Sequence, residues 1–155
     1  MTQSAKYEIS TQEFFSIFDD KTYIKKYSNV AKVIDKLRNN ILNHSDGDIN
    51  LDYADVEACF SETKQGIIQV VETDNIFMGL IKIINDSIIE AKIENLIHNI
   101  IIQFTLHKSI DMMDISNSME LIHEAANEDS QVCWSVKYDE SCSSDQLEIH
   151  SLIFV

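Results

Sequence analysis

The chain has 155 residues, three glycines, no proline and a formal net charge of −14. Ordinary usage would give about eight prolines and about eleven glycines in a chain of this length, so collagen-like, Pro-rich and Gly/Ser-linker architectures are excluded, as is a protein built on several glycine-rich phosphate loops. Because 45% of the residues are hydrophobic, we expect a compact fold despite the charge.

The negative charge lies almost entirely in the later part of the chain. Residues 1–45 carry seven basic and five acidic side chains, whereas residues 46–155 carry five and twenty-one. Such a surface repels nucleic-acid phosphates and anionic lipid headgroups, so we expect no nucleic-acid and no membrane partner. No signal-peptide pattern is present, and the three cysteines lack C-x-x-C spacing, which favours reduced thiols in a cytoplasmic protein.

Helices are expected in the first third of the chain. A short helix is predicted over Thr11–Phe18, and a longer one over Tyr23–Asn43, where apolar residues recur at spacings of three and four. Gly47, in a polar stretch, is expected to end the long helix. A third, short helix should begin at Asp52 or Tyr53 and run to about Glu62.

Strands and helices alternate in the rest of the chain. A helix capped by Asp74 and a later helix have apolar stripes, and four segments have the β-branched or alternating pattern of strands. Asp139–Asp145 is polar and is expected to form the turn between the last two strands. The predicted segments are a strand at Ile67–Val71, a helix to about Ile88, a strand at Ile97–Leu106, a helix with the stripe Ile115, Met119, Ile122 and Ala126, and strands at Val132–Tyr138 and Leu147–Val155.

This order of elements predicts an α+β fold of two layers. We expect a small mixed β-sheet packed against helices and preceded by a long N-terminal helix. We divide the chain into an N-terminal helical region, residues 1–48, and a single compact α+β unit, residues 49–155.

Most motifs of known catalytic sites are absent from this sequence. The five histidines form no H-x-x-x-H grouping, and neither G-x-S-x-G, G-x-G-x-x-G nor G-x-x-x-x-G-K-[ST] occurs. We therefore expect no cofactor, no metal site and no activity as a stand-alone enzyme.

One segment, Ile49–Val56, places polar groups in a suggestive arrangement. Asn50, Asp52 and Asp55 set an amide and two carboxylates at spacings of two and three, on a loop that leads into a helix. Such a cluster can orient a water molecule or hold a hydrated cation. The alternative is ordinary helix capping, because aspartate is favoured at helix starts.

Three stretches of the sequence resemble the carboxyl-terminal half of the FtsZ/tubulin family. VAKVIDKLRNNILNHSDGDINLDYADVEACFSE is similar to the central helix, synergy loop and following helix of FtsZ, where the loop reads close to N-[LV]-D-F-A-D-V. LIHEAANEDSQVCW and YDESCSSDQLEIHSLIFV are similar to a later helix and strand and to the final hairpin. The resemblance runs from about residue 11 to residue 155.

The resemblance implies a site that works between molecules. In the family, the synergy loop of one subunit enters the nucleotide pocket of the next, and its acidic pair completes GTP hydrolysis there. Carried over, Asp52 and Asp55 are the catalytic acids, active only in trans on a GTP-bearing partner, and Asn50, Asp52, Tyr53 and Asp55 form the binding set. Because little chain precedes the segment that resembles the central helix, we expect no GTP-binding half. The resemblance also places Thr105–Ser109 where the family has a glycine-containing turn.

The resemblance implies a modulator of an FtsZ/tubulin-like GTPase filament in cell division or the cytoskeleton. A domain with the loop and without a nucleotide pocket would dock on the filament end, cap or disassemble it, and stimulate terminal GTP hydrolysis. Two alternatives remain. The chain is a protein- or small-molecule-binding module that kept the fold and lost the polymer role, or it is one half of a split FtsZ-like GTPase.

Overall fold

The computed structural model describes residues 3–10, 53–59, 65–142 and 146–155. The helices expected over 11–18 and 23–43 lie outside these residues, as does the expected boundary between residues 48 and 49. That division of the chain stays a prediction.

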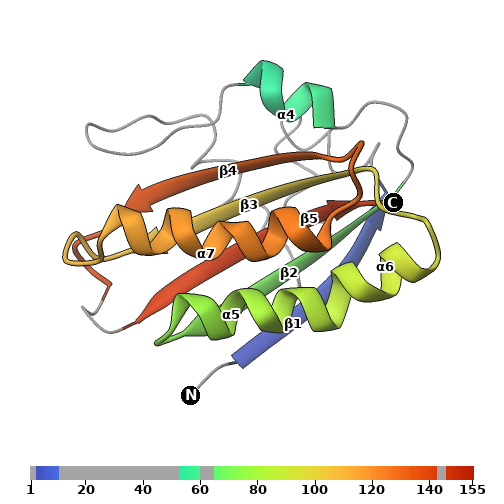
Figure 1. Cartoon of the computed structure of the whole chain (residues 1–155). Helices are drawn as coiled ribbons and strands as arrows, with labels where there is room; N and C mark the ends of the chain where they lie inside the picture. The colour runs from blue at the N-terminus through green and yellow to red at the C-terminus, as the bar shows by residue number, and fades with distance from the viewer. Residues whose placement is uncertain (1–2, 11–52, 60–64, 143–145) are drawn as a thin grey trace.

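A five-stranded sheet forms the body of the described structure (Figure 1). Its order is β1-β2-β5-β3-β4. The β3–β4 pair is parallel and the other three pairs are antiparallel, so the sheet is mixed, as predicted. The strands are β1 (Gln3–Ser10), β2 (Gln65–Thr73), β3 (Asn99–Leu106), β4 (Gln131–Tyr138) and β5 (Leu147–Phe154).

Two helical segments cover one face of this sheet (Figure 1). The first consists of α5 (Ile76–Ile83), the π-helical turn η1 (Ile84–Ile88) and α6 (Ile89–Ile93), and the second is α7 (Met112–Ala125). Together with the sheet they form the two-layer α+β arrangement that the sequence predicts. A further short helix, α4 (Tyr53–Cys59), lies apart from this layer.

The core between the helices and the sheet is built from residues that alternate along the strands. Ile100, Ile102, Phe104 and Leu106 of β3 are fully buried in it, as the predicted strand face requires. Helix α5 lies close to the sheet at Gly79, because a Cβ atom there would come within 2.7 Å of Ile149 Cδ1.

The opposite face of the sheet is buried as well. Ile68, Ile101, Leu152 and Phe154 are at most 1% exposed, and none of them belongs to the helix-side core. Polar side chains are buried on the same face, among them Gln103, Thr105, Ser135 and His150. Strand β3 is therefore buried on both faces, which a single apolar stripe does not reveal.

The helix that follows β2 differs from the prediction at both ends. Its N-cap is Asn75 and not Asp74, because Asn75 Oδ1 accepts a hydrogen bond from Met78 N–H at 3.1 Å. The helix continues past Ile88 through the π-helical turn into α6. It ends at Ile93 with Glu94 as its C-cap, and Asn95 follows with the left-handed φ of 58° that is typical of the residue after a helix C-cap.

The last two strands do not pair, contrary to the expected hairpin. β5 lies between β2 and β3, and β4 pairs with β3 at the edge of the sheet. The connection after Tyr138 therefore passes the end of β3 before β5 begins. β1 is a strand that the sequence analysis does not predict, and it pairs with β2 along its whole length, from Gln3↔Glu72 to Ser10↔Gln65.

Candidate functional site

Helix α4 contains the second half of the segment that the sequence analysis singled out, and the sheet holds it in place. Val56 and Cys59 are buried, with exposures of 1% and 0%. Asn99 Nδ2 donates to the Cys59 carbonyl at 3.1 Å, and Asn99 Oδ1 accepts from Gln131 N–H at 3.0 Å. One side chain at the start of β3 thus joins the end of α4 to the start of β4.

The predicted site residues are described only in part. Asp55 lies in the first turn of α4 and is exposed, and Tyr53 is the first residue of that helix. Asn50 and Asp52 lie outside the described residues. The exposed Asp55 is therefore the one predicted acid whose environment the structure describes.

The thiol of Cys59, on α4, is in contact with the thiol of Cys133, on β4. Cys59 Sγ lies 3.7 Å from Cys133 Sγ, and neither cysteine is in a disulfide. Cys133 alternates along β4 with Val132 and Trp134, which pack against the helix-side core. Cys133 is therefore on the opposite face of the sheet, and α4 is packed against that face.

The hydrogen bond to Cys133 is the main cause that raises the pKa of the Cys59 thiol. Burial of Cys59 raises the pKa further, and the negative charge of Asp55 adds to the effect. Asp55 and Cys59 are four residues apart on α4, so they lie one helical turn from each other. Cys59 consequently remains a protonated thiol at neutral pH.

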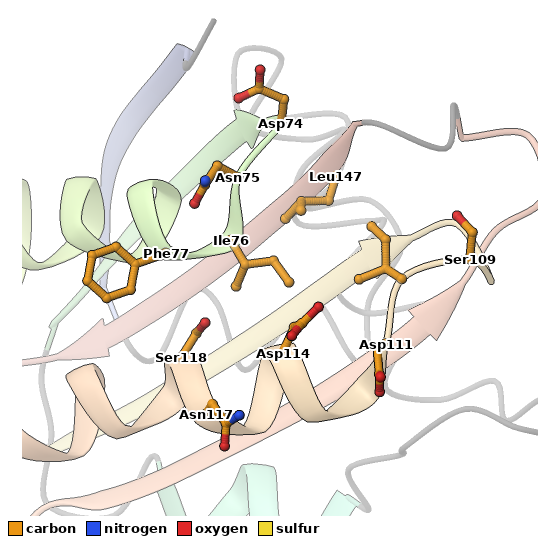
Figure 2. Close-up of a pocket in the computed structure, with 11 residues that line it drawn as sticks. Asp74, Asn75, Ile76, Phe77, Ser109, Asp111, Asp114, Asn117, Ser118 and Leu147 are labelled. Carbon is orange, nitrogen blue, oxygen red and sulfur yellow. The ribbon is translucent and has the colours of Figure 1, made fainter.

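A pocket of about 520 Å³ lies on the helix side of the sheet, where α5 and α7 begin (Figure 2). Asn75 caps α5, and Asp111 caps α7 by accepting from Met113 N–H at 2.9 Å. The lining residues are Asp74, Asn75, Ile76, Phe77, Ser109, Ile110, Asp111, Asp114, Asn117, Ser118 and Leu147.

This pocket combines an apolar floor with acidic and amide groups. Ile76 and Leu147 form part of the buried core at its base, and Phe77 beside them is 48% exposed. Figure 2 shows Asp114 and Ser118 on the side of α7 that faces Ile76. The carboxylates suit a hydrogen-bond donor or a cation. The sequence analysis named Asp74 as a helix cap and did not predict this pocket. The sequence signal for it is the pair of helix N-caps, Asn75 and Asp111, which both lie at this end of the fold.

The turn after β3 forms without glycine. Within the predicted segment Thr105–Ser109, β3 ends at Leu106, and Ile110 N–H donates to the His107 carbonyl at 3.1 Å. His107 Nδ1 also accepts from Ser109 N–H at 3.1 Å. The side chain of His107 thus accepts a backbone hydrogen bond within this turn.

Across the described residues, no helix is both long and apolar enough to cross a lipid bilayer. No protein-family model matches the chain, and no curated protein matches it.

Two solved structures of FtsZ from M. jannaschii have this fold. The empty FtsZ dimer superposes with a TM-score of 0.64 at 16% identity, over 94% of this chain and 43% of that one. A tryptophan-to-tyrosine mutant of FtsZ gives a TM-score of 0.60 at 14% identity, over 94% of this chain and 45% of that one. The chain thus spans less than half the length of these FtsZ structures, and its fold is FtsZ-like, in agreement with the resemblance to the carboxyl-terminal half.

Proposed function

We propose that this chain modulates an FtsZ/tubulin-like GTPase filament in the cytoplasm, by capping its nucleotide-bearing end or promoting its disassembly. Asp52 and Asp55 act in trans, where they complete the GTPase site of the terminal subunit. The observation that carries the proposal is Asp55, which is exposed at the start of a helix on an FtsZ-like fold.

The seating of α4 supports this role. A carboxylate that works on a partner's phosphate must be exposed and must also be held in a fixed position. Asp55 is exposed, whereas Val56 and Cys59 on the same helix are buried and Asn99 binds the helix end. The buried residues and the hydrogen bond thus fix the helix on the sheet, while Asp55 on the same helix is exposed.

The experiment uses full-length FtsZ from the source organism, assembled with GTP. Filament mass is measured by sedimentation, and GTP hydrolysis by phosphate release, with increasing amounts of this protein. We expect less sedimented filament and more phosphate per FtsZ subunit. No change in either quantity, at concentrations several times that of the filament ends, would sink the proposal.

Two variants separate docking from catalysis. Asp55→Asn removes the charge and keeps the shape, so it should abolish the stimulated phosphate release while the protein still co-sediments with filaments. Asp114→Asn is the matched control, because Asp114 is also an exposed aspartate near a helix start, in the pocket on the other face of the sheet. Equal loss in both variants would indicate a general charge effect.

The pocket at the starts of α5 and α7 favours a second candidate function, a binding module. Its volume of about 520 Å³ is within the range of small-molecule sites. In that case Asp114→Asn would alter ligand or partner binding, whereas Asp55→Asn would leave it unchanged. A panel of cationic metabolites, screened by thermal shift against both variants, distinguishes the two functions.

A further inference from the structure

We propose that Cys59 and Cys133 form a reversible intramolecular disulfide when the protein meets a peroxide, and that this bond ties α4 to β4. The inference does not depend on the proposed function. It assigns a modification site to two thiols that lie 74 residues apart in the sequence and in contact in the fold.

The geometry brings the two sulfurs within reach of a covalent bond. The Sγ atoms are 3.7 Å apart, whereas a disulfide bond is about 2.05 Å long. The elements that carry them are already joined next to the thiols, because Asn99 binds both the Cys59 carbonyl and the Gln131 backbone N–H. Closing the bond therefore requires a side-chain adjustment and no new docking of α4.

The environments of the two thiols assign them different roles. Cys133 is half-buried, whereas Cys59 is fully buried, so Cys133 is the more accessible of the two residues to a small oxidant. Cys59 also stays protonated, because its hydrogen bond to Cys133, its burial and the charge of Asp55 all raise its pKa. Cys133 is thus the sulfur that is oxidised first, and Cys59 resolves the product.

The reaction then proceeds in two balanced steps. The Cys133 thiolate attacks hydrogen peroxide, the O–O bond breaks, and after proton uptake the products are a Cys133 sulfenic acid and one water. The Cys59 sulfur next attacks the sulfenic sulfur, loses its proton and displaces a second water, which leaves the disulfide. Two thiols are oxidised by two electrons and one peroxide is reduced. A thiol reductant reverses the change.

The third cysteine is an unsuitable partner for Cys133. Cys142 lies beyond the end of β4, past the turn at Asp139–Ser141. Strand residues rise by about 3.3 Å each, so Tyr138 lies roughly 17 Å from Cys133. Cys142 stays near that end of the strand, because its N–H donates to the Asp139 carbonyl at 3.2 Å. An intramolecular Cys133–Cys142 bond is therefore excluded unless the strand opens.

The test treats the reduced protein with hydrogen peroxide, blocks the remaining thiols with an alkylating reagent and digests with trypsin without a reductant. Cleavage after Arg38, Lys64, Lys108 and Lys137 places each cysteine in its own peptide, 39–64, 109–137 and 138–155. We expect one linked species, 39–64 with 109–137, which disappears on treatment with dithiothreitol. The melting temperature of the oxidised protein should rise by on the order of 5–10 °C.

The variants identify the order of events. Cys142→Ser should form the same linked species, whereas Cys59→Ser should stop at a Cys133 sulfenic acid that dimedone labels. Asp55→Asn keeps both thiols and removes a charge that raises the Cys59 pKa, so it should speed disulfide closure severalfold. The rate of disulfide formation in Asp55→Asn tests the role of Cys59 even if Cys59→Ser fails to fold.

Several results would overturn the inference. The first is a disulfide between peptides 109–137 and 138–155, and the second is a disulfide between two molecules. The third is dimedone labelling of Cys59 in the wild type. The fourth is that all three cysteines stay unlinked at a peroxide concentration that oxidises the exposed thiols of a control protein.

Discussion

The side chain of Asn99 donates a hydrogen bond of 3.1 Å from Nδ2 to the backbone carbonyl of Cys59. Carbonyls at the end of a helix have no intrahelical partner, and here a residue of the sheet donates the missing hydrogen bond. The contact couples the position of Asp55, which lies one turn earlier on α4, to the first residue of β3.

We expect Asn99→Ala to lower the free energy of unfolding by about 1–3 kcal/mol, because it removes the partner of the part-buried Cys59 carbonyl and the side-chain bond to the exposed Gln131 N–H. Hydrogen exchange should speed up selectively at residues 53–59. The control is Asn127→Ala, which removes a similar 3.2 Å bond to the Ile97 carbonyl. If both variants loosen residues 53–59 equally, Asn99 has no special part in seating α4.

Gly79 sets how closely α5 approaches the sheet. A Cβ atom would lie 2.7 Å from Ile149 Cδ1 and 2.8 Å from Thr73 Cγ2. Gly79→Ala should therefore cost about 1–2 kcal/mol in urea unfolding, since the overpacking exceeds the gain in helix propensity. Ile149→Val removes the closer atom, so in that background the added cost of Gly79→Ala should shrink. Additive effects of the two substitutions would contradict this account.

Two buried threonines should respond in opposite ways to the same substitution. Thr105 Oγ1 finds no hydrogen-bond partner among the described residues, whereas Thr73 Oγ1 donates to the Asn75 carbonyl and accepts from the Asn75 N–H, both at 3.1 Å. Thr105→Val should leave stability unchanged or raise it by about 1 kcal/mol, and Thr73→Val should lower it by about 1–3 kcal/mol. Chemical denaturation measures both, and the reverse ranking would refute the assignment.

The exposed pair Lys108–Glu140 should shift the pKa values of its two members in opposite directions. Lys108 Nζ lies 2.7 Å from Glu140 Oε1, and this hydrogen bond is the main cause that holds the pKa of Glu140 below its ordinary value of 4.5. Because the pKa of Glu140 is lower in the folded than in the unfolded protein, the pair stabilises the fold at a pH above the unfolded-state pKa. This stabilisation is lost as the pH falls through the folded-state pKa. The effect is small, because both side chains are largely exposed.

Lys108→Met should return the Glu140 pKa towards 4.5 in an NMR titration of the side-chain carboxyl. High salt should produce part of the same change in the wild type. A Glu140 pKa that is indifferent to both treatments would show that the pair does not form in solution.

Much of the helix-side core follows from the sequence. Ile100, Ile102, Phe104 and Leu106 were predicted on one face of a strand and are buried together. Ile115, Met119 and Ile122 were predicted as a helical stripe and are buried beside them. Both patterns are local, so period alone identifies them.

Strand pairing could not be predicted in the same way. The alternation in Val132–Tyr138 and Leu147–Phe154 is the same whether the two strands are neighbours or are separated by β3. The polar segment between them favours a turn, and only the burial of both faces of β5 requires the central place. β1 had a usable signal, since Ala5, Tyr7 and Ile9 alternate with polar residues.

Of the candidate site features, the sequence predicted Asp55 but neither the thiol contact nor the pocket. Asp55 was singled out by a sequence pattern and by the resemblance that the sequence carries. The structure describes it as exposed, and its catalytic role stays a prediction. The thiol contact between Cys59 and Cys133 joins residues 74 apart, and the pocket joins Asn75 to Asp111. No local pattern encodes either, because each depends on how α4, α5 and α7 are placed on the sheet.

The central place of β5 has a consequence for how the chain folds during synthesis. β5 follows the other described strands in the sequence, yet it connects β2 to β3. Until it emerges from the ribosome, the pairs β1–β2 and β3–β4 are separate half-sheets, and the edges of β2 and β3 that β5 joins are unpaired. Such edges are templates for pairing between chains, so nascent chains that stall before Leu147 should aggregate or recruit chaperones instead of forming a smaller stable domain.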